Sequence, residues 1–121
     1  MRCIIKLISI ANKLGLKLLT KNPDKDTKVV GLYACDLLSW VMVNAKTEHL
    51  WFTVMGNVNS IALASLNNVS AIVLVEGAIL DNDAKIKAEE HCITVYSTNL
   101  DCATALIKAN ELLNLNKAER Y

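Results

Sequence analysis

Three polar segments lie at the ends of apolar runs of the chain, and they carry the side chains best suited to hold a small ligand. The apolar runs lie at 50–54, 71–75 and 93–96. Hydroxyls, amides and the free backbone amides at a helix start bind phosphate or carboxylate groups, and a carboxylate accepts hydrogen bonds from ribose hydroxyls. The candidate ligand-binding residues in these segments are Thr53, Gly56, Asn57, Asn59, Glu76 and Thr98.

The two asparagines also have a purely structural interpretation. A helix is predicted over 57–66, directly after Gly56. An asparagine at the start of a helix accepts a hydrogen bond from one of its free amides and so caps it. We favour capping by Asn57 or Asn59 over anion binding at this position.

The residues that usually perform catalysis have ordinary explanations here. His49 precedes a predicted strand, and His91 ends a predicted helix, where the helix dipole favours positive charge. Cys35, next to Asp36, would need a nearby histidine to act as a nucleophile. The four glycines, at 15, 31, 56 and 77, do not form a phosphate-binding loop. We therefore predict no catalytic residues and no cofactor.

The cysteines give no sign of a metal site. None of them forms the close CxxC pair that is typical of structural zinc or redox sites. Isolated cysteines beside apolar residues are more often small buried side chains of a reduced protein. The four are Cys3, Cys35, Cys92 and Cys102.

Composition limits the classes of partner. The chain has 121 residues, of which 53% are hydrophobic, and a formal net charge of +1. This length fits one domain, and a balanced charge with only two arginines, Arg2 and Arg120, disfavours nucleic-acid binding. Lys6, Asn12 and Lys13 interrupt the apolar start of the chain, and no run approaches the length of a membrane span. We expect a cytoplasmic protein without membrane contact.

The pattern of elements predicts an α/β fold. The three apolar runs are typical of buried strands, and the segments between them, 57–66 and 81–91, are predicted helices. Right-handed crossovers then place the strands parallel in one sheet, with helices on both faces. We predict a small three-layer domain with a mainly parallel sheet built on this βαβαβ series, which gathers the candidate residues at the carboxyl edge of the sheet.

Further elements surround this series. A helix is predicted over 3–14, a short strand over 16–20, an extended segment over 28–33 and a helix over 37–45. We predict Asp36 and Asp83 as helix caps, and Thr98 with Asp101 as a capping pair for the last helix. The domain covers 1–113, and a polar C-terminal tail covers 114–121.

Several segments resemble the DRTGG domain family in order and spacing. The strongest are Asp36-Leu-Leu-Ser and Asn59-Ser-Ile-Ala-Leu-Ala, and Val73-Leu-Val-Glu-Gly, the helix with Lys87-Ala-Glu-Glu and Ile93-Thr-Val-Tyr-Ser-Thr extend the match. The family signature is degraded to Asp26-Thr-Lys-Val-Val-Gly31, which lacks the arginine and the first glycine. The chain is similar to the N-terminal domain of HPr kinase/phosphorylase and to DRTGG domains of phosphotransacetylases and CBS-containing pyrophosphatases.

The resemblance implies a regulatory or assembly role, and the CBS context implies adenine-nucleotide signalling. Two hypotheses follow: a non-catalytic domain that senses an adenine nucleotide or small anion, and a structural homodimerisation module without a ligand, acting with itself or with an unknown protein partner. We expect a homodimer because large apolar residues gather in one region, namely Trp40, Val41, Met42 and Trp51.

Overall fold

The structure is a computed structural model, and it describes residues 4–118. The strands are β1 (Ile5–Lys6), β2 (Lys17–Leu18), β3 (Lys28–Val29), β4 (Gly31–Ala34), β5 (His49–Thr53), β6 (Ala71–Leu74) and β7 (Val95–Ser97). The helices are α1 (Leu7–Leu14), α2 (Leu38–Asn44), α3 (Val58–Asn67), α4 (Asn82–Glu90) and α5 (Cys102–Ala118). Among the described residues, no helix is long and apolar enough to cross a bilayer.

The main sheet has five strands in the order β2-β7-β6-β5-β4. Strands β4 to β7 are parallel, and β2 joins the edge antiparallel to β7. The predicted α/β class and the parallel βαβαβ series are confirmed, with β6 in the middle of the sheet as its apolar sequence indicates. A separate two-stranded sheet pairs β1 with β3.

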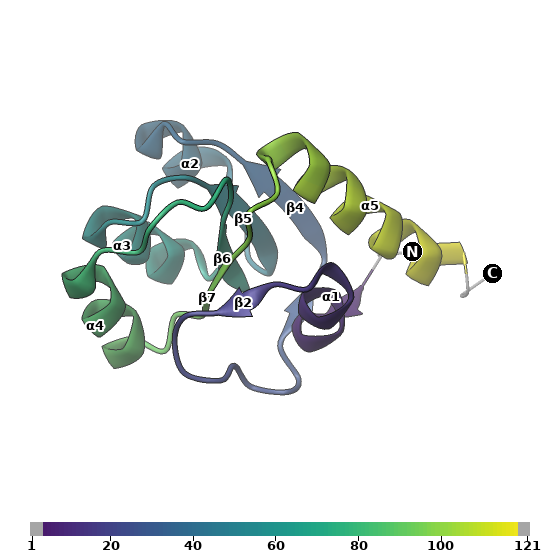
Figure 1. Ribbon diagram of the computed structural model, residues 1–121, viewed down its shortest axis with the longest axis horizontal. Coiled ribbons are helices and arrows are strands. Elements are labelled where there is room, and N and C mark those ends of the chain that lie inside the picture. The colour runs from purple at the N-terminus through teal and green to yellow at the C-terminus, as the bar shows by residue number, and fades with distance from the viewer. Residues whose placement is uncertain (1–3, 119–121) are drawn as a thin grey trace.

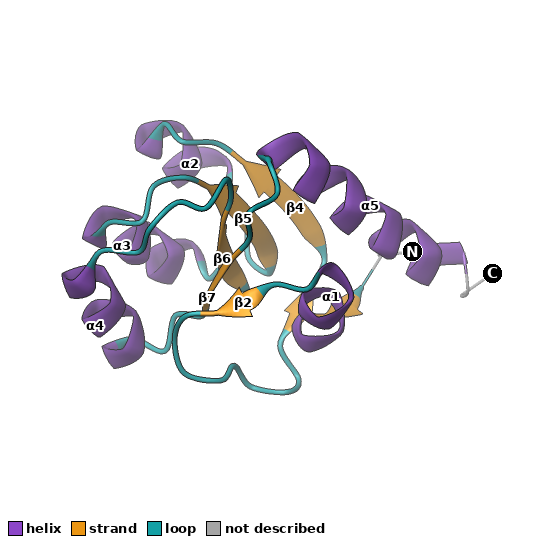
Figure 2. Cartoon of the chain, viewed as in Figure 1, coloured by secondary structure: helices purple, strands orange, loops and turns teal. Residues whose placement is uncertain are grey.

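Helices cover both faces of the sheet (Figures 1 and 2). Each of α2, α3 and α4 connects two adjacent parallel strands, and right-handed crossovers of this kind place all three on the same face. The two ends of the chain supply α1 and α5, which lie together on the opposite face. The three predicted layers are therefore present.

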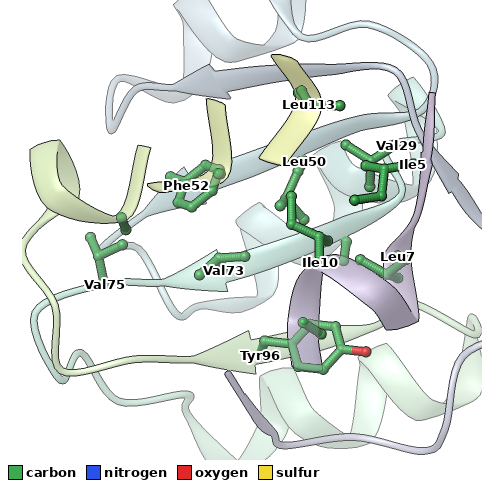
Figure 3. Packing of buried hydrophobic residues seen from close by; sticks show 14 residues of the cluster. Ile5, Leu7, Ile10, Val29, Leu50, Phe52, Val73, Val75, Tyr96 and Leu113 are labelled. Carbon is green, nitrogen blue, oxygen red and sulfur yellow. The ribbon is translucent and has the colours of Figure 1, made fainter. Parts of the chain in front are cut away.

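Alternating side chains of the strands build a core on each face. In β5, Leu50 and Phe52 pack among residues of α1 and α5, whereas Trp51 packs among residues of α2, α3 and α4. All three are fully buried. Figure 3 shows Phe52 and Val73 on the face covered by α1 and α5, together with Ile10 of α1 and Leu113 of α5. Burial of both faces explains why this strand is apolar at every position from 50 to 52.

The N-terminal helix is shorter than predicted. Helix α1 starts at Leu7 rather than near residue 3, because Ile5 and Lys6 pair with Val29 and Lys28. The predicted start itself lies outside the described residues. Gly15 ends the helix as expected, with a φ of 67° that glycine adopts without strain.

The last helix continues beyond its predicted end. Helix α5 extends to Ala118, into the segment 114–121 predicted as a tail. Each further residue of a helix adds a backbone hydrogen bond, and no glycine or proline interrupts this segment. Residues 119–121 of the predicted tail lie outside the described residues.

Candidate functional site

The carboxyl edge of the parallel sheet was the predicted site, and its loops come from the ends of β4, β5, β6 and β7. Near β4 and β5, side chains of this edge bond to one another. Asp36 Oδ1 accepts hydrogen bonds from Thr53 Oγ1 at 2.6 Å and from Val54 N at 2.9 Å. Thr53, which is 1% exposed, thus uses its hydroxyl inside the protein.

This arrangement corrects the predicted role of Asp36. The residue before α2 is Leu37, and no side chain caps the helix. The carboxylate of Asp36 instead reaches the neighbouring strand end, where it satisfies a buried hydroxyl and a backbone amide. The predicted cap Asp83 is also wrong: Asp81 precedes α4, and Asp83 Oδ1 accepts a bond from the adjacent Ala84 N.

Gly56 is covered by a loop rather than open to a ligand. A Cβ at this position would lie 2.1 Å from the carbonyl oxygen of Ile79. Gly56 O also accepts a hydrogen bond from Asp81 N at 2.8 Å. The absence of a side chain lets the loop before α4 pack directly against the loop before α3.

The asparagines follow the capping interpretation. Asn57 Oδ1 accepts a hydrogen bond from Ser60 N at 3.1 Å, so Asn57 is the N-cap of α3. Asn59 lies in the first turn and is exposed. The first amides of α3 are therefore partly satisfied by the protein itself.

Thr98 lies at a crevice at the other end of the same edge. Gly77 N donates to Thr98 O at 3.0 Å, and Leu100 N donates to Thr98 Oγ1 at 3.2 Å. The neighbouring Glu76 is exposed and donates its amide to Leu100 O. The crevice has a volume of about 560 Å³, and its lining comprises Gly15, Lys17, Gly77, Ala78, Ser97, Thr98, Asn99 and Leu100.

The structure thus does not bring the six predicted residues together, and Asn59 and Glu76 are exposed outside the crevice lining. Thr98 lines the crevice, whereas Thr53, Gly56 and Asn57 make internal contacts near β5 and α3. Sequence reasoning missed Lys17 and Gly15, because nothing in the sequence indicates that β2 pairs antiparallel with β7. The sequence predicted Gly15 only as the residue that ends the first helix, not as part of a ligand site.

Charge differs between the crevice and the surroundings of Cys102, at the start of α5. The pKa of Cys102 is raised by burial and by the nearby carboxylates of Asp36, Glu76 and Asp101, so negative charge gathers around this thiol. Among the described residues that line the crevice, Lys17 is the only one with an ionisable side chain. Lys17 therefore supplies positive charge at the crevice, whereas an anion beside Cys102 is disfavoured.

The last helix begins later than the predicted capping pair. Helix α5 starts at Cys102, and Asp101 accepts hydrogen bonds from Thr104 N at 3.1 Å and Thr104 Oγ1 at 2.6 Å. These bonds lower the pKa of Asp101. Thr98 is therefore free of the helix start and belongs to the crevice.

Histidine and cysteine lie at opposite edges of the sheet. His49 starts β5 opposite Gly31, whereas Cys35 follows the end of β4. The His49 ring stacks on Tyr33, with 6.5 Å between centroids, and Nδ1 accepts a hydrogen bond from Lys46 N. Burial, followed by the charge of Lys46, lowers the pKa of His49. These contacts give the ring a structural role next to Gly31.

Comparisons by sequence find no relative: no family model and no curated protein matches the chain. Its structure is similar to a crystal structure of the CBS and DRTGG domains of the regulatory region of Clostridium perfringens pyrophosphatase, complexed with the activator diadenosine tetraphosphate. The TM-score is 0.70 at 17% identity, over 86% of this chain and 45% of that one. This chain thus spans less than half of that regulatory region and shares the fold of the matched part, which supports the DRTGG-like fold predicted from the sequence.

Proposed function

We propose that this chain is a non-catalytic regulatory module that binds a small anionic ligand, with adenine nucleotides as the first class to test. The observation that carries the proposal is the fold, which matches part of a regulatory region solved with a dinucleotide activator over 86% of this chain. In such a module, ligand binding shifts the equilibrium between conformations of a larger assembly.

The crevice beside Thr98 is the proposed ligand site. The Lys17 ammonium supplies positive charge, and Ser97, Thr98 and Asn99 supply hydroxyl and amide groups. Its volume of about 560 Å³ falls within the range of about 300–1,000 Å³ that small-molecule sites occupy. We restrict the site to this crevice because the groups at Thr53, Gly56 and Asn57 are engaged inside the protein.

Thermal shift and NMR test the proposal with AMP, ATP, diadenosine tetraphosphate and acetyl phosphate as probes. A true ligand raises the melting temperature, since saturation at about 100 times Kd adds about 2.7 kcal/mol to the unfolding free energy. We expect amide shifts at 97–100 and at Lys17. Lys17→Gln should weaken binding, whereas Lys13→Gln, on the exposed face of α1, should not. Unchanged spectra at millimolar concentrations of all four probes would contradict the proposal.

A second candidate function, homodimerisation, is supported by an exposed apolar surface on α2. We define the α2 surface as the N-cap residue Leu37 together with Trp40 and Val43 of the helix, which are 62%, 61% and 66% exposed and recur every three residues. Met42 is also exposed. Large apolar side chains that gather on one helix face mark contact surfaces.

Two of the residues expected at this surface lie in the core instead. Trp51 is fully buried, and its Nε1 donates a hydrogen bond to Cys35 O at 3.0 Å. Val41 faces inward from α2 and is 1% exposed. Of the four residues predicted at a dimer interface, only Trp40 and Met42 are exposed. The structure adds two further exposed apolar residues, Leu37 and Val43.

Analytical ultracentrifugation tests the dimer. The wild-type chain should sediment as a dimer at tens of micromolar, and the double variant Trp40→Gln/Val43→Gln should sediment as a monomer. Ile107→Gln, which alters an exposed apolar residue on α5, is the matched control and should leave the dimer intact. A wild-type monomer at this concentration would exclude a stable homodimer.

A further inference from the structure

A second pocket lies at the opposite edge of the sheet, where the strands begin. Its volume is about 650 Å³. Its walls include the residues just before β5, β6 and β7, together with the loop that leads into β3. Glu48, Ser70 and Thr94 come from the first three of these segments, Lys21 comes from the loop, and Lys28 is the first residue of β3. The proposed anion site does not involve any of these groups.

A buried hydroxyl faces this pocket without a partner. Thr94 is 7% exposed, and its Oγ1 makes no hydrogen bond within the described residues. Among the described residues, every side-chain oxygen or nitrogen that is fully enclosed has a hydrogen-bond partner. Because the Thr94 hydroxyl has none, we infer that it is open to solvent, and the opening is the pocket that Thr94 lines. Buried polar groups are normally hydrogen-bonded, and an open one is ready to bond a ligand.

Comparison with other threonines sets this hydroxyl apart. Thr53 Oγ1 is bonded to Asp36, and Thr20 Oγ1 accepts a hydrogen bond from Val95 N at 3.1 Å. Ser70, in the same pocket wall, donates its hydroxyl to Lys28 O. Thr94 is therefore the buried hydroxyl of this wall that a ligand can reach.

The field around Thr94 favours positive charge. Helices α3 and α4 both end at this edge, with Asn68 and Cys92 of the following turns in the pocket wall. Helix C-termini carry partial negative charge. The half-buried Glu89, in the last turn of α4, adds a carboxylate to the same wall. Lys21 lies in the loop that leads into β3, and Lys28 is the first residue of β3; these two lysines are outnumbered in the lining by the carboxylates of Asp24, Asp26, Glu48 and Glu89.

We propose that this pocket binds a small organic ligand through a protonated primary amine. An ammonium has three donors and no acceptor, so it matches the Thr94 hydroxyl oxygen and the Glu89 carboxylate at the end of a helix. Lys21 and Lys28 then bond hydroxyl or carboxylate groups elsewhere on the ligand. Polyamines and amino acids share this chemistry. Phosphate groups belong at the opposite edge, beside Lys17.

NMR titration tests the proposal on the full chain. The probes are putrescine, as a polyamine, and lysine, as an amino acid, with 1,4-butanediol as the uncharged match of putrescine. We expect amide shifts at 88–94 and 68–70 with at least one amine and none with the diol. If only putrescine saturates the pocket, the ligand class is a polyamine, and if only lysine does, it is an amino acid.

Two variants test the assigned contacts. Thr94→Val keeps the shape and removes the hydroxyl, and Glu89→Gln removes the charge. Each should raise Kd about tenfold, as expected for the loss of a hydrogen bond to a charged group. Glu90→Gln, an exposed neighbour on α4, is the control and should keep wild-type affinity. Thr94→Val should not lower the melting temperature, because the hydroxyl has no partner in the protein.

Three results would overturn the proposal: no shifts at millimolar amine, equal shifts with the diol, or wild-type affinity in Thr94→Val. Any of them leaves the anion site untouched, since that site lies at the other edge of the sheet and is tested by other ligands and by Lys17→Gln.

Discussion

Thr53 Oγ1 donates a 2.6 Å hydrogen bond to Asp36 Oδ1 and so joins the loop after β4 to the end of β5. The same carboxylate oxygen accepts a bond from Val54 N, and Thr53 Oγ1 in turn accepts one from Met55 N at 3.2 Å. One carboxylate thus fixes the ends of two neighbouring parallel strands. The polar groups of Asp36 and Thr53 therefore stabilise the fold at these strand ends.

Replacement of Asp36 by Ala should lower the unfolding free energy by about 1.5–3 kcal/mol, the usual worth of hydrogen bonds to a charged group. Urea denaturation of Asp36→Ala, Thr53→Val and the double variant measures the coupling between the two side chains. Effects that add within about 0.5 kcal/mol would show that the bond contributes nothing of its own.

Gly56→Ala should be strongly destabilising. The new methyl group would lie 2.1 Å from a backbone carbonyl oxygen of the loop before α4, and a backbone atom has no alternative rotamer. We expect a loss at the upper end of about 1–3 kcal/mol, measured by denaturant unfolding. Gly15→Ala gives the contrast, because there the cost comes from a φ of 67° with no atom within 4 Å. Wild-type stability of Gly56→Ala would mean that the two loops separate readily.

The two asparagines at the start of α3 form a matched pair. Asn57→Ala removes the cap and should cost about 0.5–2 kcal/mol. Asn59→Ala alters an exposed side chain in the first turn and should change the unfolding free energy by less than about 0.5 kcal/mol. Thermal unfolding of both variants decides the assignment, and the reverse order of effects would move the cap to Asn59.

The unfolding free energy should fall as the solution is acidified through the range in which His49 titrates. Burial lowers the pKa of His49 in the folded state below the ordinary value of about 6.5. The unfolded chain then binds more protons between the two pKa values, so the stability present above about pH 6.5 is lost as the pH falls toward the folded pKa. Melting temperatures from about pH 8 to about pH 5 measure this loss.

Two histidine variants separate this effect from general acid denaturation. His49→Gln should flatten the pH dependence, whereas His91→Gln, at the exposed end of α4, should retain it. An unchanged slope in His49→Gln would assign the pH dependence to other groups.

The sequence was most informative where burial dictates residue type. Strands β5 and β6 are covered on both faces, and their unbroken apolar runs predicted them as central parallel strands. The strand predicted over 16–20 contains β2, but its antiparallel pairing with Tyr96 and the pairing of β1 with Val29 could not be predicted, because both partners are distant in the chain. Short edge pairing of this kind is set by tertiary contacts.

Side-chain roles at the candidate site were less predictable for the same reason. An aspartate before a helix indicates a cap, yet Asp36 bonds to residues 17 and 18 positions away. Gly56 indicated an open backbone, whereas its partner is the loop at 79–81. Asn57 was predictable as a cap because its partner, Ser60, lies three residues along the chain.

The layer formed by α1 and α5 has a consequence for synthesis on the ribosome. This layer covers the sheet face that carries Phe52 and Val73, and both strands are synthesised long before the α5 residues Ala105, Ala109 and Leu113. At about 5–20 residues per second, the delay is on the order of seconds. During that time only α1 covers this face, so part of the apolar sheet surface is open to other polypeptides. A chain that terminates before α5 should therefore be prone to aggregate through this face.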